Sequence, residues 1–173
     1  MGTVTTLEST IPVGARILLE SSVLVAHIEG GEVTSHLATT IIDGFLRDDR
    51  NAGVMSTVTV SEILVRPHRL GRARDIGLGV LEMSGLTLRS VDFLVAAEAA
   101  RMRAESSIRL PDAIVLATGI VAGATCFVTN DRRLAAATPA LAPSLQVCLL
   151  SDHILSAAER GHQAPPAGII GRR

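Results

Sequence analysis

Four acidic residues, Glu20, Glu62, Asp112 and Asp131, each stand beside an apolar stretch of the sequence. Carboxylates gathered in one place repel one another, so a cluster of four implies a bound cation. Oxygen ligands of this kind suit a hard divalent cation such as Mg²⁺ or Mn²⁺. A bound divalent cation activates water and stabilises the negative charge that develops on phosphate oxygens. If folding brings the four acids together, the sequence encodes a site for metal-assisted hydrolysis.

Two of the acids have an alternative explanation in helix capping. The segment Thr59-Val60-Ser61-Glu62 has the form of a capping box, in which the Glu62 side chain bonds back to the start of a helix. Asp112 stands in the first turn of an expected helix, directly behind Pro111, where a negative charge is favourable. For these two positions both interpretations stay open at the level of the sequence.

Asp131 and Glu20 differ in how easily capping explains them. Asp131 can cap a short helix over Arg132–Ala136, and this interpretation and the metal site are about equally supported. Glu20 interrupts the apolar run from Arg16 to Ala26, where nothing local compensates a buried carboxylate. Its remaining structural explanation is hydrogen bonding to Ser21, Ser22 or nearby backbone amides.

Alternating apolar patterns predict the elements that position these acids. Continuous apolar runs are typical of strands buried on both faces of a parallel sheet, and apolar residues at helical spacing lie between them. We expect strands at 16–26, 53–60, 86–89, 126–129 and 145–150, and helices at 33–47, 59–65, 75–83, 91–105, from 110 onward, and at 152–159. The alternation predicts an α/β fold with a parallel sheet covered on both faces. Ligands bind beyond the carboxyl ends of the strands in such sheets, where the four acids would lie.

Composition bounds the class of protein. The 173 residues are 47% hydrophobic with a net charge of −1, which suits one folded domain without a global basic field. We expect a loose extension over 1–14, the domain over 15–160 and a disordered tail over 161–173. Cys126 and Cys148 lie in expected strands without C-x-x-C spacing, which favours reduced core thiols. We see no signal peptide or confident membrane span, and we expect a cytoplasmic protein.

Other catalytic motifs are missing from the sequence. There is no phosphate-binding G-x-x-x-x-G-K-[ST] loop, no H-E-x-x-H spacing and no Ser-His-Asp set. A phosphatase or response-regulator-like domain is disfavoured because the first strand carries no paired Asp residues. Every basic residue other than histidine is arginine, and Arg109, Arg132 and Arg133 lie nearest to the acids in the sequence. We regard these three as candidate phosphate contacts, the arginines of 66–74 as a solvated basic loop, and the three phenylalanines as core.

In this order the motifs resemble a PIN domain. The segments are Leu19-Glu20-Ser21-Ser22, Ser61-Glu62-Ile63-Leu64, Pro111-Asp112-Ala113 and Val128-Thr129-Asn130-Asp131-Arg132-Arg133. The resemblance covers roughly 16–150 and is strongest to the ribonuclease toxins of bacterial toxin–antitoxin pairs, the VapC type. It implies a three-layer α/β/α sandwich with a central, mainly parallel sheet. It also implies phosphodiester hydrolysis of RNA with Mg²⁺ or Mn²⁺ as cofactor.

The resemblance assigns roles to individual residues. Glu20, Asp112 and Asp131 would lie at the metal, and Glu62 would hold a metal-bound water or act as a base. Hydroxyl support would come from Ser21 or Ser22 and from Thr129. The family's usual first acid is Asp, whereas this chain has Glu20. A cognate antitoxin and a second copy of the chain are the expected partners, and RNA is the expected substrate. The alternative is a PIN-fold protein with a weakened site that acts through RNA or protein binding.

Overall fold

The computed structural model describes residues 6–154, which form one five-stranded sheet flanked by helices. The strands are β1 (Arg16–Leu19), β2 (Ala52–Ser56), β3 (Leu86–Arg89), β4 (Cys126–Thr129) and β5 (Gln146–Leu149). They lie in the order β3-β2-β1-β4-β5, and every pairing is parallel. All five carboxyl ends therefore meet at one edge of the sheet.

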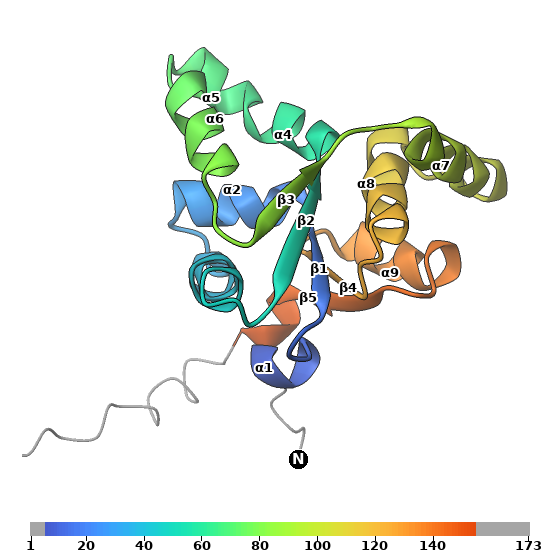
Figure 1. Cartoon of the computed structure of the whole chain (residues 1–173), viewed down its shortest axis with the longest axis horizontal. Coiled ribbons are helices and arrows are strands. Elements are labelled where there is room, and N and C mark those ends of the chain that lie inside the picture. Colours follow the sequence, from blue (N-terminus) through green and yellow to red (C-terminus); the bar gives the residue numbers. More distant parts are fainter. Residues whose placement is uncertain (1–5, 155–173) are drawn as a thin grey trace, which may run out of the picture.

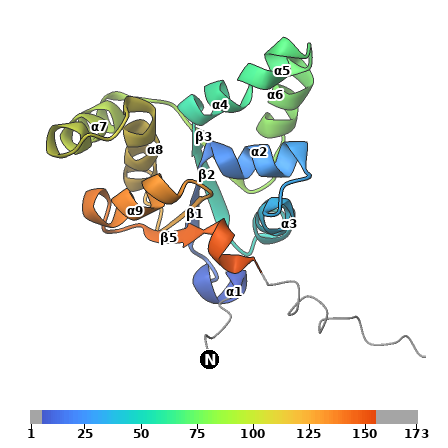
Figure 2. The same ribbon diagram turned by 180° about the vertical axis from the view of Figure 1, so that it is seen from behind.

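Helices cover both faces of the sheet. The helical elements are α1 (Leu7–Thr10), α2 (Ser21–Glu29), α3 (Ser35–Thr39), the π-helical η1 (Thr40–Leu46), α4 (Thr57–Ile63), α5 (Val65–Arg69), α6 (Ala73–Leu81), α7 (Phe93–Glu105), α8 (Leu110–Val121), α9 (Arg132–Leu141) and the 3₁₀ turn η2 (Leu150–His153). Figure 1 shows α2–α6 on one side of the strands and α7–α9 on the other, and the reverse view in Figure 2 agrees. The predicted three-layer α/β/α architecture is confirmed.

Two hydrophobic cores lie on the two faces, and alternate strand residues enter them. Ile17 and Leu19 of β1 point into the core beneath α2, α3 and η1, whereas Leu18 points into the core beneath α7, α8 and α9. All three side chains are fully buried. Strands with both faces covered need continuous apolar sequence, which is why these runs predict the sheet so well.

Close contact between α8 and β1 depends on a glycine. A Cβ atom at Gly119 would lie 2.6 Å from the Leu18 Cδ2 atom, so the helix can approach the strand this closely only without a side chain there. The approach matters for the site, because α8 carries Asp112 in its first turn and β1 leads directly into Glu20.

The amino-terminal segment is more ordered than we expect from the sequence. Leu7 is 5% exposed and Ile11 is fully buried, so the prediction of a loose extension over 1–14 is wrong for this part. A short Thr-rich segment without periodicity does not reveal that two isolated apolar side chains complete a core. The predicted tail over 161–173 and the predicted helix beyond His153 lie outside the described residues.

Several helices and strands begin or end at other residues than predicted, because a capping residue sets where each helix begins. The first strand ends at Leu19, where Glu20 caps α2, and the second ends at Ser56, which caps α4. The long helix expected over 33–47 is present as α3 followed by η1. The basic segment 66–74 is largely helical, in α5 and the start of α6, rather than a loop. Asp92, and not Ser90, caps α7.

Two further findings concern apolar residues. Phe45 and Phe127 are buried as predicted, but Phe93 is 82% exposed at the start of α7, so its assignment to the core is wrong. No helix within residues 6–154 has the length and apolar character needed to cross a membrane.

Candidate active site

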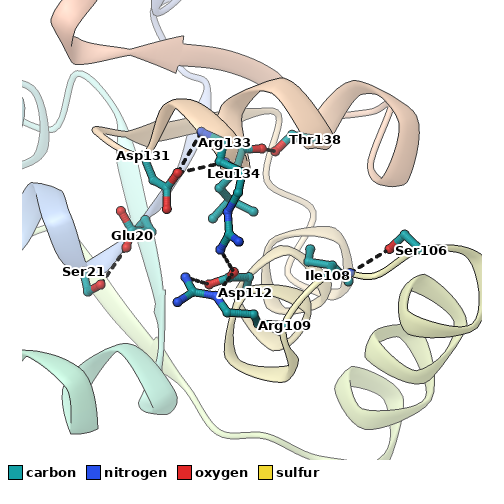
Figure 3. A network of polar contacts seen from close by, with 10 residues as sticks. All are labelled: Glu20, Ser21, Ser106, Ile108, Arg109, Asp112, Asp131, Arg133, Leu134 and Thr138. Carbon is teal, nitrogen blue, oxygen red and sulfur yellow. Dashed lines mark hydrogen bonds and ion pairs between the residues drawn. The ribbon is translucent and has the colours of Figure 1, made fainter.

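The carboxyl edge of the sheet gathers the residues that the sequence singles out. The chain reverses its direction of strand addition between β1 and β4, which are neighbours in the sheet although far apart in sequence. Crevices at such switch points are the usual ligand sites of open α/β sheets. Glu20 follows β1, and Asp131 follows β4 after one intervening residue. Figure 3 shows Glu20 and Asp131 close together, on the same side of Asp112.

Glu20 is held by hydroxyl groups and one backbone amide. Its Oε1 atom accepts a hydrogen bond of 2.6 Å from the Ser21 hydroxyl, and its Oε2 atom accepts one of 3.1 Å from the Ser22 amide. The Ser22 hydroxyl also donates to Oε2. The carboxylate therefore caps α2, and the predicted hydrogen bonding to both serines is present. Capping fixes the position of the carboxylate and does not exclude a second role.

Thr129 connects the ends of β1 and β4. Its hydroxyl donates to the Glu20 Oε2 atom at 3.1 Å and accepts a hydrogen bond of 2.9 Å from the Asp131 amide. The Thr129 side chain is fully buried. This one hydroxyl thus orients two of the predicted acids, which agrees with the supporting position that the family resemblance implies for it.

Asp131 caps α9, as one of its two interpretations requires. The Oδ1 atom accepts hydrogen bonds from the amides of Arg133 at 2.8 Å and Leu134 at 3.0 Å. The helix it caps extends to Leu141, which is longer than the predicted Arg132–Ala136. None of the described hydrogen bonds uses the Oδ2 atom of Asp131. In Figure 3 the carboxylate lies beside Glu20, and Asp112 lies across from both.

Asp112 lies in the first turn of α8, as predicted, and its carboxylate is engaged by arginine side chains. Arg109 donates to it from Nε at 2.8 Å and from Nη2 at 3.1 Å, a bidentate pair. The Arg133 Nη2 atom lies 3.5 Å from the same carboxylate. The Asp112 side chain is 13% exposed, whereas the two arginine side chains are 61% and 69% exposed. Asp112 is therefore a largely buried anion under two exposed cations.

Glu62 does not form the predicted capping box. Ser56 is the residue that caps α4, through a hydrogen bond from the Val58 amide, and Thr59 lies inside the helix with its hydroxyl buried and without a hydrogen-bond partner in the described structure. Loss of hydration raises the pKa of Glu62, and repulsion from Glu20 and Asp112 acts in the same direction. The Ser21 hydroxyl and Arg109 oppose the rise. Glu62 therefore lies near enough to Glu20 and Asp112 to be affected by their charge.

Arg109 lies among the carboxylates as a cation supplied by the chain itself. Its pKa is raised, chiefly by the hydrogen bonds and charge of Asp112, with further contributions from Asp131 and Glu62. A positive charge is thus stabilised where the acids converge. Arg133 also approaches Asp112, but Arg132 pairs with Asp152 at 3.7 Å, away from the predicted acids. Two of the three predicted arginines therefore lie at the site.

The donor set fits a hard divalent cation. It consists of carboxylate and hydroxyl oxygens, and the Arg109 guanidinium shows that a cation is favourable there. Within residues 6–154 no three His, Cys, Asp or Glu side chains converge closely enough to form a complete cage as they stand. Mg²⁺ needs only one or two protein carboxylates and keeps several waters, so a complete cage is not required. One or two of Glu20, Asp112 and Asp131 would supply those carboxylates.

Asn130 is a site residue that sequence reasoning missed. Its backbone amide donates to the Ser22 hydroxyl at 2.9 Å, and its side-chain amide donates to the Thr34 hydroxyl at 2.8 Å. It ties the turn after β4 to the start of α2 and to the segment before α3. The available signal was its position between Thr129 and Asp131, directly after the apolar run of β4.

Comparison with known proteins identifies the family. The family model for the PIN domain matches residues 17–138. A search of curated proteins finds no match. The structure resembles a toxin–antitoxin complex from Klebsiella pneumoniae, with 19% identity, a TM-score of 0.56 and coverage of 76% of this chain and 95% of that one.

Two further solved structures agree. VapBC2 from Rickettsia felis, bound to a DNA fragment from its promoter, matches with 14% identity, a TM-score of 0.57 and coverage of 78% and 98% of the two chains. VapC20 from Mycobacterium tuberculosis, a toxin that cleaves the sarcin–ricin loop, matches with 16% identity, a TM-score of 0.56 and coverage of 70% and 94%. These TM-scores show a shared fold, and the family model covers most of the chain. The chain belongs to the PIN domain family.

Proposed function

We propose that this protein is a metal-dependent endoribonuclease that acts in the cytoplasm as the toxin of a toxin–antitoxin pair. The observation that carries the proposal is the set of carboxylates at the switch point between β1 and β4. Glu20 and Asp131 are joined there through Thr129, opposite Asp112. Membership of the PIN family and the likeness to a toxin that cleaves the sarcin–ricin loop support RNA as the substrate.

The reaction requires a water to attack phosphorus while the bond from phosphorus to the leaving ribose oxygen breaks. A bound Mg²⁺ or Mn²⁺ would activate that water and neutralise charge on the phosphate. Glu62 is suited to accept the water's proton, because its pKa is raised towards the working pH. Arg109 and Arg133 lie where they can contact the phosphate once they leave Asp112.

A second candidate function is binding without efficient cleavage. The observation that favours it is the Glu20 carboxylate, which already accepts hydrogen bonds from Ser21, Ser22 and Thr129. Replacement of Glu20 by Asp separates the two candidates. If the site suits the longer side chain, this variant cleaves RNA more slowly than wild type, and Glu20→Gln does not cleave at all. If the site is degenerate, Glu20→Asp cleaves faster than wild type.

The partners that we propose are an antitoxin and a second copy of the chain. Two apolar surfaces remain exposed within residues 6–154. One lies on α5 and α6 and includes Leu70, Leu78 and Leu81, which are 60%, 47% and 66% exposed. The other lies at the start of α7 and includes Phe93 and Leu94, at 82% and 60%. We assign the first surface to the antitoxin and the second to the other copy. The helix region 33–47 buries its apolar residues from Leu37 onward and offers no comparable apolar surface.

Thermal unfolding with Mn²⁺ tests the metal site independently of cleavage. A ligand that binds only the folded state adds about 2.7 kcal/mol of stability at one hundred times its Kd. Mn²⁺ should therefore raise the melting temperature of wild type and have a much smaller effect on Asp131→Asn. Each protein is compared with itself in EDTA, because Asp131→Asn also weakens the cap of α9. No shift of wild type at millimolar Mn²⁺ would contradict the metal site.

A further inference from the structure

A cavity of about 400 Å³ opens directly beside Asp112, and the proposed hydrolysis does not use it. It is bounded by the last residue of α7, the connecting residues 106–109, the first turn of α8 and one face of α9. Figure 3 shows Ser106 and Ile108 on the side of Asp112 that faces away from Glu20. The cavity therefore continues the active site towards the α7–α8 hairpin.

The walls of the cavity are mainly apolar. The apolar lining residues are Ile108, Leu134, Ala137, Ala140 and Leu141. The Ser106 hydroxyl, which also lines it, is already used: it donates to the Met102 carbonyl at 2.8 Å and accepts from the Ile108 amide at 3.3 Å. These two bonds fix the turn that forms one wall. The lining is thus shaped by hydrogen bonds but presents mostly carbon to an occupant.

Charge is distributed unevenly around the cavity. Arg109 and Arg133 line it together with Asp112, so two cations stand where it meets the active site. Glu105 lines it from the end of α7, where it pairs with Arg101 at 2.6 Å. A ligand with a phosphate and a flat, largely apolar group would place its phosphate at the two arginines and its flat group between the apolar walls.

The volume limits the size of the occupant. Small-molecule sites usually measure about 300–1,000 Å³, and 400 Å³ lies near the lower end of that range. It suits one nucleoside rather than a longer stretch of RNA. Phe45 and Phe127 are buried elsewhere and Phe93 is outside the lining, so no aromatic ring of the described chain is available for stacking here. Apolar side chains can take that role for a base turned out of its stack.

We propose that this cavity binds the unpaired base of an RNA nucleotide next to the cleaved phosphodiester, with that nucleotide's phosphate at Arg109 and Arg133. The inference rests on the proposed function, because it is the active site that puts RNA at the mouth of the cavity. Single-stranded bases are what sequence-specific RNA-binding sites usually recognise. The cavity would accordingly select the base at one position beside the cut.

Ligand titration followed by NMR tests the cavity without relying on cleavage. The probes are AMP, CMP, GMP and UMP, compared with ribose 5-phosphate, which has the phosphate and sugar but no base. At least one nucleotide should bind wild type about tenfold or more tightly than ribose 5-phosphate, and it should shift the amide signals of residues 106–109 and 134–141. Equal binding of all four nucleotides and ribose 5-phosphate would overturn the proposal.

Alanines of α9 provide matched variants. Ala140 is exposed and lines the cavity, whereas Ala136 is exposed on the same helix and does not line it. Ala140→Leu should remove the advantage of the nucleotide over ribose 5-phosphate, and Ala136→Leu should retain it. Ala137→Leu, at a second lining position, should act like Ala140→Leu, and melting curves check that each variant folds. A nucleotide advantage that survives both cavity variants would overturn the proposal. If those variants abolish antitoxin binding instead, the cavity is a protein-docking site.

Cleavage of a randomised RNA pool distinguishes failure of this inference from failure of the proposed function. Wild type and Ala136→Leu should show the same base bias beside the cut, and Ala140→Leu should lose the bias while it still cleaves. Identical bias in all three proteins would overturn the base pocket and leave the nuclease intact. If no protein cleaves, the proposed nuclease function fails, and the NMR comparison still decides whether the cavity binds a base.

Discussion

Glu62 is an acid whose ionised form the fold disfavours. Its pKa is raised in the folded protein, first by loss of hydration and then by repulsion from Glu20 and Asp112. Between the ordinary pKa of 4.5 and the raised value, the folded state binds more protons than the unfolded state. Stability contributed by this group is therefore present at low pH and is lost as the pH rises through that interval.

The variant Glu62→Gln removes this dependence. In EDTA its melting temperature relative to wild type should increase as the pH rises from about 4 to 7, because only wild type must ionise a disfavoured carboxyl. Melting curves of both proteins across that range measure the difference. A difference that stays constant with pH would show that the surroundings of Glu62 do not disfavour its charge.

Arg109 competes with a metal ion for Asp112. Its bidentate hydrogen bonds at 2.8 and 3.1 Å occupy the carboxylate that a metal would share. Arg109→Gln frees this carboxylate and removes a positive charge beside it, so it should lower the Kd for Mn²⁺ by about a few fold. The measurement is a titration of free Mn²⁺ by electron paramagnetic resonance.

Arg132 provides the control for the Mn²⁺ titration. Arg132 pairs with Asp152 at 3.7 Å instead of with Asp112, and its side chain is 71% exposed. Arg132→Gln makes the same change of charge without opening the Arg109–Asp112 pair, so it should leave the Kd nearly unchanged. Equal tightening in both variants would mean that net charge alone, and not the pair, sets the affinity.

At the scale of elements, the junction between β1 and β4 depends on one threonine. The buried Thr129 hydroxyl bonds both the Glu20 carboxylate and the Asp131 amide. Thr129→Val keeps the shape and leaves that amide without its partner, which should cost about 1–3 kcal/mol of unfolding free energy. Denaturant unfolding measures the loss, and Mn²⁺ affinity should fall with it.

Thr118 is a suitable comparison for Thr129. It is also fully buried, but its hydroxyl bonds only the Ile114 carbonyl of its own helix, at 2.7 Å. Thr118→Val should change the unfolding free energy less and leave the metal affinity unaltered. If both variants behaved alike, the link between the two strands would be ordinary core packing and not a device that positions the acids.

The elements that sequence predicts well are those governed by continuous burial. The strand Cys126–Thr129 is buried throughout and ends where its apolar run ends, because a parallel sheet covered on both faces requires that pattern. The same logic correctly places Glu20 and Asp131 at one edge of the sheet. Such predictions hold because many residues each contribute a small free energy of burial, and all of these contributions favour the same placement of the strand.

A feature is harder to predict from sequence when two nearby residues could each form it. Thr59 and Glu62 have the spacing of a capping box, but Ser56 three residues earlier caps the helix instead. Phe93 looks like a core residue and is 82% exposed, because burial depends on which face the whole of α7 presents. The Arg133–Asp112 contact and the adjacent cavity also require the fold, since they join side chains from separate elements.

For the whole molecule, two exposed apolar surfaces predict two separable associations. Leu81→Glu on α6 should abolish co-purification with the product of a small neighbouring reading frame, because a charge is costly in an apolar interface. It should leave self-association unchanged in sedimentation. Leu94→Glu on α7 should show the reverse pattern. Each variant is the control for the other, and loss of both associations in either one would contradict two independent surfaces.

Cleavage of RNA by the purified protein tests the central claim most directly. Wild type is incubated with a structured RNA pool in Mg²⁺, in Mn²⁺ and in EDTA, alongside Asp112→Asn. This variant keeps the shape of a side chain that is 13% exposed but removes its charge. We predict internal cleavage that depends on either metal and falls on the order of a hundredfold or more in the variant. Cleavage that persists in EDTA, or that Asp112→Asn performs as fast as wild type, would contradict the account.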